Sequence, residues 1–195
     1  MGHSIQNNTN SWNEAKILQM DPNEAIEVIM DRFGDEIKRL VYTYVQNTAD
    51  TDDITQEIFV TVYRKLSTFK GKSALRSWIY SIAINKCKDY LRSWQFRNKR
   101  LKEKISLSLN SDKRIENTLE LEWMKKQDAN ELLHCLMDLP VKYREVVILY
   151  YFKEMTTKEI SIILMVKEGT VRTRLDRGRD KLKQILRERG DSSEG

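Results

Sequence analysis

A run of polar side chains between residues 170 and 177 could bind the edges of DNA bases. On a helix, Val171, Leu175 and Gly178 follow one another at intervals of four and three, so they share an inward face, and Gly178 allows close packing. Arginine can bridge the acceptors of guanine, threonine can contact bases or phosphates, and an acid favours a donor such as cytosine N4. The outward side chains are Thr170, Arg172, Thr173, Asp176 and Arg177.

Residues that carry catalysis are scarce. The histidines are His3 and His134, and the sequence shows neither a phosphate-binding glycine loop nor a nucleophile motif. Cys87 and Cys135 lie far apart inside helical patterns, which predicts no disulfide framework and no zinc site. We therefore expect no enzyme, no cofactor and no metal, and a reducing cytoplasmic location. We find neither an export signal nor an apolar run near the ~20 residues of a membrane span.

Charge is distributed unevenly along the chain. Lys and Arg number 34 against 29 Asp and Glu, and the net charge of +5 is only mildly basic, so its position matters more than its size. One basic run spans 92–104, where Glu103 is the only acid, and a second spans 172–183. Both runs adjoin amphipathic segments, where a phosphate-binding surface would lie. The alternative for either run is a solvated helix face.

Composition and length indicate how these residues are positioned. The 195 residues are 40% hydrophobic and 32% charged, with 7 Gly and 2 Pro, which is typical of packed helices. We predict an all-α fold of two small helical domains joined by a flexible linker, the C-terminal one containing a helix-turn-helix. The predicted segments are a disordered extension over 1–22, a first domain over 23–96, a linker over 97–124, a second domain over 125–188 and a disordered tail over 189–195. The linker mixes charged and polar residues without a sustained apolar stripe, which indicates either a tether or a weak helix.

Apolar spacing locates the helices of the first half. Side-chain oxygens near residue 50 can cap a helix, and the acids that follow favour its positive end. A glycine between two lysines at 70–72 then interrupts the helical period. The expected helices are one or two over 23–46, interrupted at Gly34, one from Asp50 or Thr51 to about Leu66, and one from about Leu75 to Trp94.

The second half ends in two helices joined by a tight turn. Thr156 and Glu159 form a cap with its acidic partner, and the apolar residues that follow give a short helix. The turn is 165–167, and the helix carrying Arg172 follows. A short helix, a three-residue turn and a second helix with such an outer face fit a major groove. The alternative is a helical hairpin whose arginines only solvate the surface.

The stretch LPVKYREVVILYYFKEMTTKEISIILMVKEGTVRTRLDRGRDKLK closely resembles the second DNA-binding domain of extracytoplasmic-function (ECF) sigma factors. The resemblance implies that Arg172, Thr173, Asp176 and Arg177 read the promoter −35 element. The most specific pieces are Leu139-Pro140, Tyr143-Arg144, Glu159-Ile160, Gly169-Thr170-Val171 and Arg174-Leu175.

Two residues depart from the family pattern. Met165 stands where the family often has a turn glycine, which implies either a turn without positive φ or some strain. Lys167 stands where a Ser or Pro often opens the recognition helix, and it places a cation at the positive helix end, at a cost of ~1 kcal/mol. Base preference is therefore not transferable from relatives.

The stretch DTDDITQEIFVTVYRKLSTFKGKSALRSWIYSIAINKCKDYLR resembles the other domain of the same family. Ile54, Ile58, Phe59, Val62 and Leu66 are predicted to face inward. The resemblance implies that the opposite stripe docks on the clamp helices of the polymerase β′ subunit, whereas the bland alternative is helix solubility. The implied docking residues are Asp53, Gln56, Glu57, Val60 and Arg64.

The loop and helix after this stripe correspond to the family segment that binds and opens the promoter −10 element. Lysines can hold the strand while amides and Ser73 contact a flipped base. Trp78 matches a position that primary sigma factors use to wedge the duplex, although an aromatic at this spacing can equally be core. The implied −10 residues are Lys70, Gly71, Lys72, Ser73, Trp78, Asn85, Lys88 and Arg92.

Both blocks together predict an ECF-type sigma factor that directs promoter-specific initiation. The implied partners are core RNA polymerase, through the β′ clamp helices and the β flap, promoter DNA and an anti-sigma factor, with no small-molecule substrate. The main rival is a helix-turn-helix regulator that binds duplex DNA without polymerase. A sensor domain has no reason to carry the docking stripe beside the 70–72 loop, which favours the sigma factor.

Overall fold

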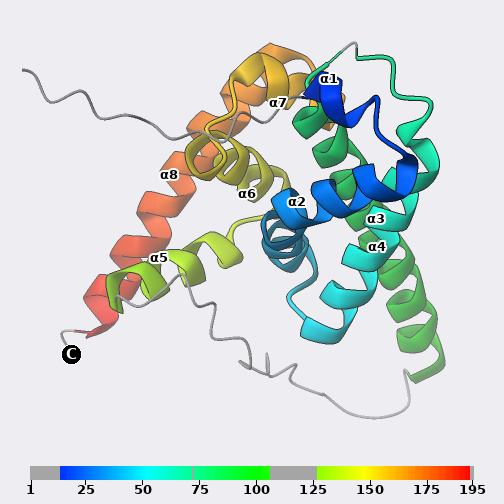
Figure 1. Cartoon of the computed structure of the whole chain (residues 1–195). Helices are drawn as coiled ribbons and strands as arrows, with labels where there is room; N and C mark the ends of the chain where they lie inside the picture. The colour runs from blue at the N-terminus through cyan, green and yellow to red at the C-terminus, as the bar shows by residue number, and fades with distance from the viewer. Residues whose placement is uncertain (1–13, 72, 106–126, 194–195) are drawn as a thin grey trace, which may run out of the picture.

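The computed structural model describes residues 14–71, 73–105 and 127–193. Helices dominate these ranges, which contain no strand, so the all-α prediction is confirmed (Figure 1). No described helix combines the length and the apolar character of a membrane span. The elements are α1 (Glu14–Ile17), α2 (Pro22–Val45), α3 (Thr48–Leu66), α4 (Leu75–Ile105), α5 (Gln127–Asp138), α6 (Val141–Val147), the π-helical η1 (Ile148–Phe152), α7 (Thr157–Leu164) and α8 (Glu168–Ser193).

Caps determine where the first long helices begin and end. The Asp21 carboxylate accepts the Asn23 N–H at 2.8 Å at the start of α2. The helix ends at Val45 and is followed by Gln46, which caps it in the left-handed conformation. Gly34 lies inside this single helix and does not interrupt it. The α3 cap is Asn47, whose side chain accepts the Asp50 N–H at 2.9 Å. Our start at Asp50 or Thr51 was therefore wrong, because an earlier side chain caps the helix.

The helices α2, α3 and α4 surround an apolar core, as the spacing predicted. Every α3 residue expected to face inward is buried. On α4, Ile79, Ala83 and Cys87 are fully covered, and Tyr90 and Leu91 pack partly against them. Tyr80 is the bulkiest of the fully covered side chains. The first half is therefore a packed three-helix unit, and this core fixes which faces of α3 and α4 point outward.

Three predicted boundaries were wrong. We expected the extension over 1–22 to be disordered, but its described part contains the helix α1. Ile17 of this helix is 3% exposed, and the Glu14 carboxylate accepts the Leu75 N–H at 3.0 Å. The α4 helix continues to Ile105, inside the predicted linker, because lysine and arginine favour helices even without an apolar face. The α8 helix runs to Ser193, inside the predicted tail. The stretch 106–126 lies outside the described residues.

The helix-turn-helix of the second half forms as its sequence signals indicate. Thr156 and Glu159 complete a capping box at the start of α7. Val171, Leu175 and Gly178 form the buried face of α8, and α6 packs against it. Arg189, near the end of α8, contacts Asp138 at 2.6 Å and so joins α8 to the end of α5.

The two halves of the chain pack together around a buried arginine. Arg144 is 7% exposed, and its guanidinium donates to the carbonyls of Met137 at 2.7 Å and Leu139 at 2.9 Å, at the end of α5. The same group donates to the Thr43 carbonyl near the end of α2. Helix α7 packs against α4, and one continuous apolar core spans both halves. The sequence did not predict this contact.

Gly178 yields a prediction about this packing. A Cβ at position 178 would lie 2.9 Å from Val147 Cγ2, and a β-branched valine has little freedom to move away. Overpacking lowers the free energy of unfolding by ~1–3 kcal/mol, whereas the better helix propensity of alanine raises it by ~1 kcal/mol. We expect Gly178→Ala to lower the free energy of unfolding by about 1 kcal/mol, measured by chemical denaturation.

Gly34→Ala is the matched control. Position 34 is also helical, but nothing lies within 4 Å of the added Cβ. The free energy of unfolding of this variant should rise by about 0.4–1 kcal/mol. An equal gain from both substitutions would show that α8 does not pack tightly on α6.

Candidate DNA-binding and polymerase-binding surfaces

The outer face of α8 presents the predicted −35 residues to solvent. Arg172, Thr173, Asp176 and Arg177 are exposed, and Thr170 is half-buried. Arg172 Nη2 lies 2.8 Å from Glu168 Oε1, and Asp176 pairs with Arg179. These pairs are exposed, so they are weak and can exchange for phosphates or base edges. Their shared face is established, whereas their contact with DNA stays a prediction.

The turn before α8 shows how the chain accommodates Met165 and Lys167, the two departures from the family pattern. Met165 adopts φ 54° and ψ 45°, so the strained, left-handed alternative is the one the chain uses. At the start of α8, the Glu168 carboxylate accepts the Thr157 hydroxyl at 2.6 Å. That hydrogen bond and the Arg172 guanidinium lower the pKa of Glu168, which keeps an anion at the positive helix end. This anion offsets the unfavourable position of Lys167.

A shallow hollow of about 430 Å³ lies on the outer face of α3. Lys86 of α4 closes one side of it, with Nζ 3.1 Å from Glu57 Oε2. Val60 is 42% exposed and contributes an apolar side chain among charged neighbours. A charged rim around an exposed apolar residue suits a docking surface. The hollow is lined by Asp53, Gln56, Glu57, Val60, Thr61, Arg64 and Lys86, which include every predicted docking residue.

The loop before α4 depends on a glycine. Gly71 adopts φ 65°, a left-handed conformation that side chains rarely take. Lys70 beside it is exposed and Ser73 is half-buried, whereas Lys72 lies outside the described residues. Trp78 packs its ring on Phe69 with centroids 5.0 Å apart. Because Trp78 is only partly buried, its ring supports the loop and also reaches the surface.

The predicted −10 residues of α4 do not share one environment. Asn85 and Arg92 are exposed, and Arg92 lies 3.5 Å from Asp89. Lys88 instead faces the second half of the chain, where its Nζ lies 3.1 Å from Glu145 Oε2. Our expectation of one outer side for these residues therefore holds for α4 alone and fails once the two halves pack together.

Sequence patterns did not reveal the ionic residues between the halves. Glu145 is 3% exposed, and Tyr143 and Arg144 before it are also buried. Three consecutive buried residues break the one-sided pattern of an amphipathic helix, because α6 is covered on more than one side. Glu36 and Lys153 also meet across the contact, with Lys153 Nζ 3.1 Å from Glu36 Oε1.

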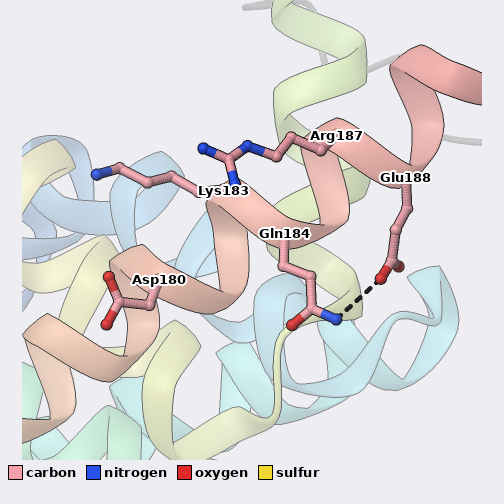
Figure 2. Close-up of a pocket in the computed structure, with 5 residues that line it drawn as sticks. All are labelled: Asp180, Lys183, Gln184, Arg187 and Glu188. Carbon is pink, nitrogen blue, oxygen red and sulfur yellow. Dashed lines mark hydrogen bonds between the residues drawn. The ribbon is translucent and has the colours of Figure 1, made fainter.

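Other features support no chemical site. Figure 2 shows a hollow lined by side chains of α8 alone, in which Gln184 Nε2 donates to Glu188 Oε1 at 2.9 Å. Such an open helix face cannot enclose a ligand. Within the described ranges, no cluster of three or more His, Cys, Asp or Glu could hold a metal ion. Burial raises the pKa of Cys87 to about 12, so its thiol is a poor nucleophile.

Comparison with known proteins agrees with this arrangement. Residues 29–97 match the family Sigma-70 region 2, and residues 129–182 match the family Sigma-70, region 4. The ECF RNA polymerase sigma factor SigW of Bacillus subtilis is 29% identical over 177 residues, covering 89% of this chain and 95% of the relative. The ECF RNA polymerase sigma-E factor of Escherichia coli is 28% identical over 169 residues, covering 84% and 87%.

Solved structures share the fold. RpoE of Bartonella quintana, solved with the anti-sigma factor NepR, superposes with a TM-score of 0.63 at 16% identity, covering 84% of this chain and 98% of that one. CnrH, solved with the cytosolic domain of CnrY, gives 0.61 at 20% identity, covering 88% and 93%. Regions 2 and 4 in this order define a bacterial transcription initiation factor of the sigma-70 class. Within that class, the chain belongs to the ECF sigma factors.

The left-handed turn at Met165 yields a second prediction. A side chain in this conformation costs ~1–2 kcal/mol, whereas the freedom that glycine adds to the unfolded chain costs ~0.4–1 kcal/mol. Met165 is 72% exposed, so its removal sacrifices little packing. We expect Met165→Gly to raise the free energy of unfolding by about 0.5–1 kcal/mol in chemical denaturation.

Met165→Ala is the control, because alanine keeps the Cβ that causes the strain. This variant should leave the free energy of unfolding nearly unchanged. A gain from alanine as large as the gain from glycine would place the strain elsewhere than in the backbone of residue 165.

Proposed function

We propose that this sigma factor binds core RNA polymerase in the cytoplasm and directs it to promoters through paired −10 and −35 contacts. The α3 hollow docks on the β′ clamp helices, the loop at 70–73 and α4 bind the opened −10 strand, and the outer face of α8 reads the −35 element. The protein supplies positioning and DNA opening, and the polymerase supplies the chemistry. One observation carries the proposal: all the predicted docking residues line a single surface hollow.

A regulator that binds duplex DNA without polymerase is not favoured. Such a protein needs only the helix-turn-helix, and the match to sigma-70 region 2 over 29–97 would have no purpose in it. We also propose the β flap as a second polymerase contact and an anti-sigma factor as a protein partner. The second idea is supported by the fold shared with RpoE of Bartonella quintana, which was solved bound to NepR.

Run-off transcription with purified core polymerase tests the proposal directly. Core enzyme alone should give no promoter-specific transcript, and addition of this protein should produce one from promoters selected from a genomic library. A protein that neither binds core enzyme nor supports initiation would overturn the proposal.

The −35 assignment predicts the effect of Arg172→Ala and Arg177→Ala. Each loses a charged donor from the exposed α8 face, at ~1–3 kcal/mol per base contact, which corresponds to a loss of about ten-fold in promoter affinity at 1.4 kcal/mol. Initiation at −35-dependent promoters should fall while core binding stays intact. Arg187→Ala, an exposed arginine further along α8, is the control and should change neither. Equal loss of core binding would mean that the assigned face is wrong.

The docking assignment predicts a different pattern for Asp53→Ala and Glu57→Ala. Both carboxylates line the α3 hollow, so their loss should weaken the association with core polymerase before it affects DNA contacts. Binding of labelled protein to core enzyme measures this directly. Asp35→Ala removes a carboxylate that is 92% exposed on α2 and serves as the control. Unchanged association in both docking variants would reject the assignment.

A further inference from the structure

A carboxylate one turn before Arg172 holds this first arginine of the predicted −35 face. Glu168 is the first residue of α8, and its Oε1 lies 2.8 Å from Arg172 Nη2. Residues four apart on a helix lie side by side, and an acid that precedes a base by four is the favourable order. The Glu168 side chain is 39% exposed, against 68% for Arg172. The carboxylate therefore lies deeper in the surface than the guanidinium that it holds.

A hydroxyl from the other helix of the helix-turn-helix supports this carboxylate. Thr157, the first residue of α7, donates its hydroxyl to the same Glu168 Oε1 at 2.6 Å. Thr157 is half-buried and β-branched, so its side chain has few rotamers to choose from. Two hydrogen bonds that meet at one oxygen thus join Thr157 to Arg172. An ordinary ion pair on a helix surface has no such support from a second helix.

An arginine held in this way is prepared to read a base. The guanidinium carries several N–H donors, so the bond from Nη2 to Glu168 leaves donors for the O6 and N7 acceptors of guanine. A side chain that is already ordered also loses less conformational entropy when it binds. We propose that Glu168 is a positioning residue that sets base discrimination at the −35 element through Arg172, with Thr157 as its support. This inference rests on the proposed −35 role of Arg172.

Glu168 acts on base preference and on general DNA affinity in opposite directions. Its negative charge repels phosphates whatever the sequence, so removal of the charge should strengthen binding to all DNA. Removal of the acceptor oxygen should weaken the preference for the correct base by about two- to ten-fold, the range for ordering one long side chain. Glu168→Ala removes both the charge and the acceptor, whereas Glu168→Gln removes the charge and keeps an acceptor oxygen.

Transcription from a promoter library randomised at the −35 bases tests the proposal in the holoenzyme. Sequencing of the transcripts gives the base preference at each position, and Arg172→Ala identifies the position that Arg172 reads. Glu168→Ala should reduce the preference there by about two- to ten-fold, and Glu168→Gln should retain most of it. Equal losses in the alanine and glutamine variants, or no loss in the alanine variant, would overturn the proposal.

Thr157 provides a test that leaves the charge of α8 unchanged. Thr157→Val replaces the hydroxyl by a methyl group and should reduce base preference at the Arg172 position alone, whereas Thr157→Ser keeps the hydroxyl and should retain it. Asp180→Ala removes an exposed carboxylate further along α8 and is the control for charge, so no preference should change. A uniform loss at all −35 positions in Thr157→Val would contradict the supporting role, because it would place Thr157 on a phosphate.

The same library separates failure of this inference from failure of the −35 assignment. Unchanged preferences in Arg172→Ala would show that Arg172 reads no base, and the inference would fall with the assignment. A preference that depends on Arg172 but not on Glu168 would overturn the positioning role alone. Circular dichroism of each variant confirms that it folds before its preferences are compared.

Discussion

The buried guanidinium of Arg144 is the interaction on which the arrangement of the second half depends. The last carbonyls of a helix have no partner within it, and a cation near them satisfies both their hydrogen bonds and the helix dipole. Arg144 does this for the end of α5 through Met137 and Leu139, and it reaches the Thr43 carbonyl of α2 as well. A charge so deeply buried must be fully paired, which restricts α6 to one position.

This position determines which surfaces remain open. The outer face of α8 and the hollow on α3 stay exposed, whereas Lys88 of α4 is half-buried, with its Nζ 3.1 Å from Glu145 Oε2 of α6. The predicted −35 residues and the predicted docking residues are therefore accessible in the packed form, whereas Lys88 is a predicted −10 residue that the second half contacts.

Local patterns predicted what local physics controls. The inward face of α3 and the capping box at Thr156 follow from side-chain spacing and from hydrogen bonds within one turn. The start of α3 was missed because Asn47 and Asp50 are both good caps, and the helix uses Asn47, whose side chain accepts the Asp50 N–H. The docking stripe of α3 proved to be one surface, since helical phase alone fixes it.

The contact between the halves could not be predicted in this way. Glu145 and Lys88 read as unrelated charges on separate helices, and no periodicity links positions so far apart in sequence. The length of α4 was equally hidden, because a basic segment without an apolar stripe is compatible with either a solvated helix or a linker. Tertiary contact decided the first case, and the helix propensity of lysine and arginine decided the second.

Thr43 pairs with Arg144 and Tyr44 pairs with Glu145, and the order of synthesis determines when these pairs can form. In each pair the residues stand 101 positions apart. A ribosome adds roughly 5–20 residues per second, so the first half emerges several seconds before its counterpart exists. During that interval Lys88 has no carboxylate from α6 beside it, and any folding of α2 to α4 proceeds without this contact. The interface between the halves can therefore form only as the last step.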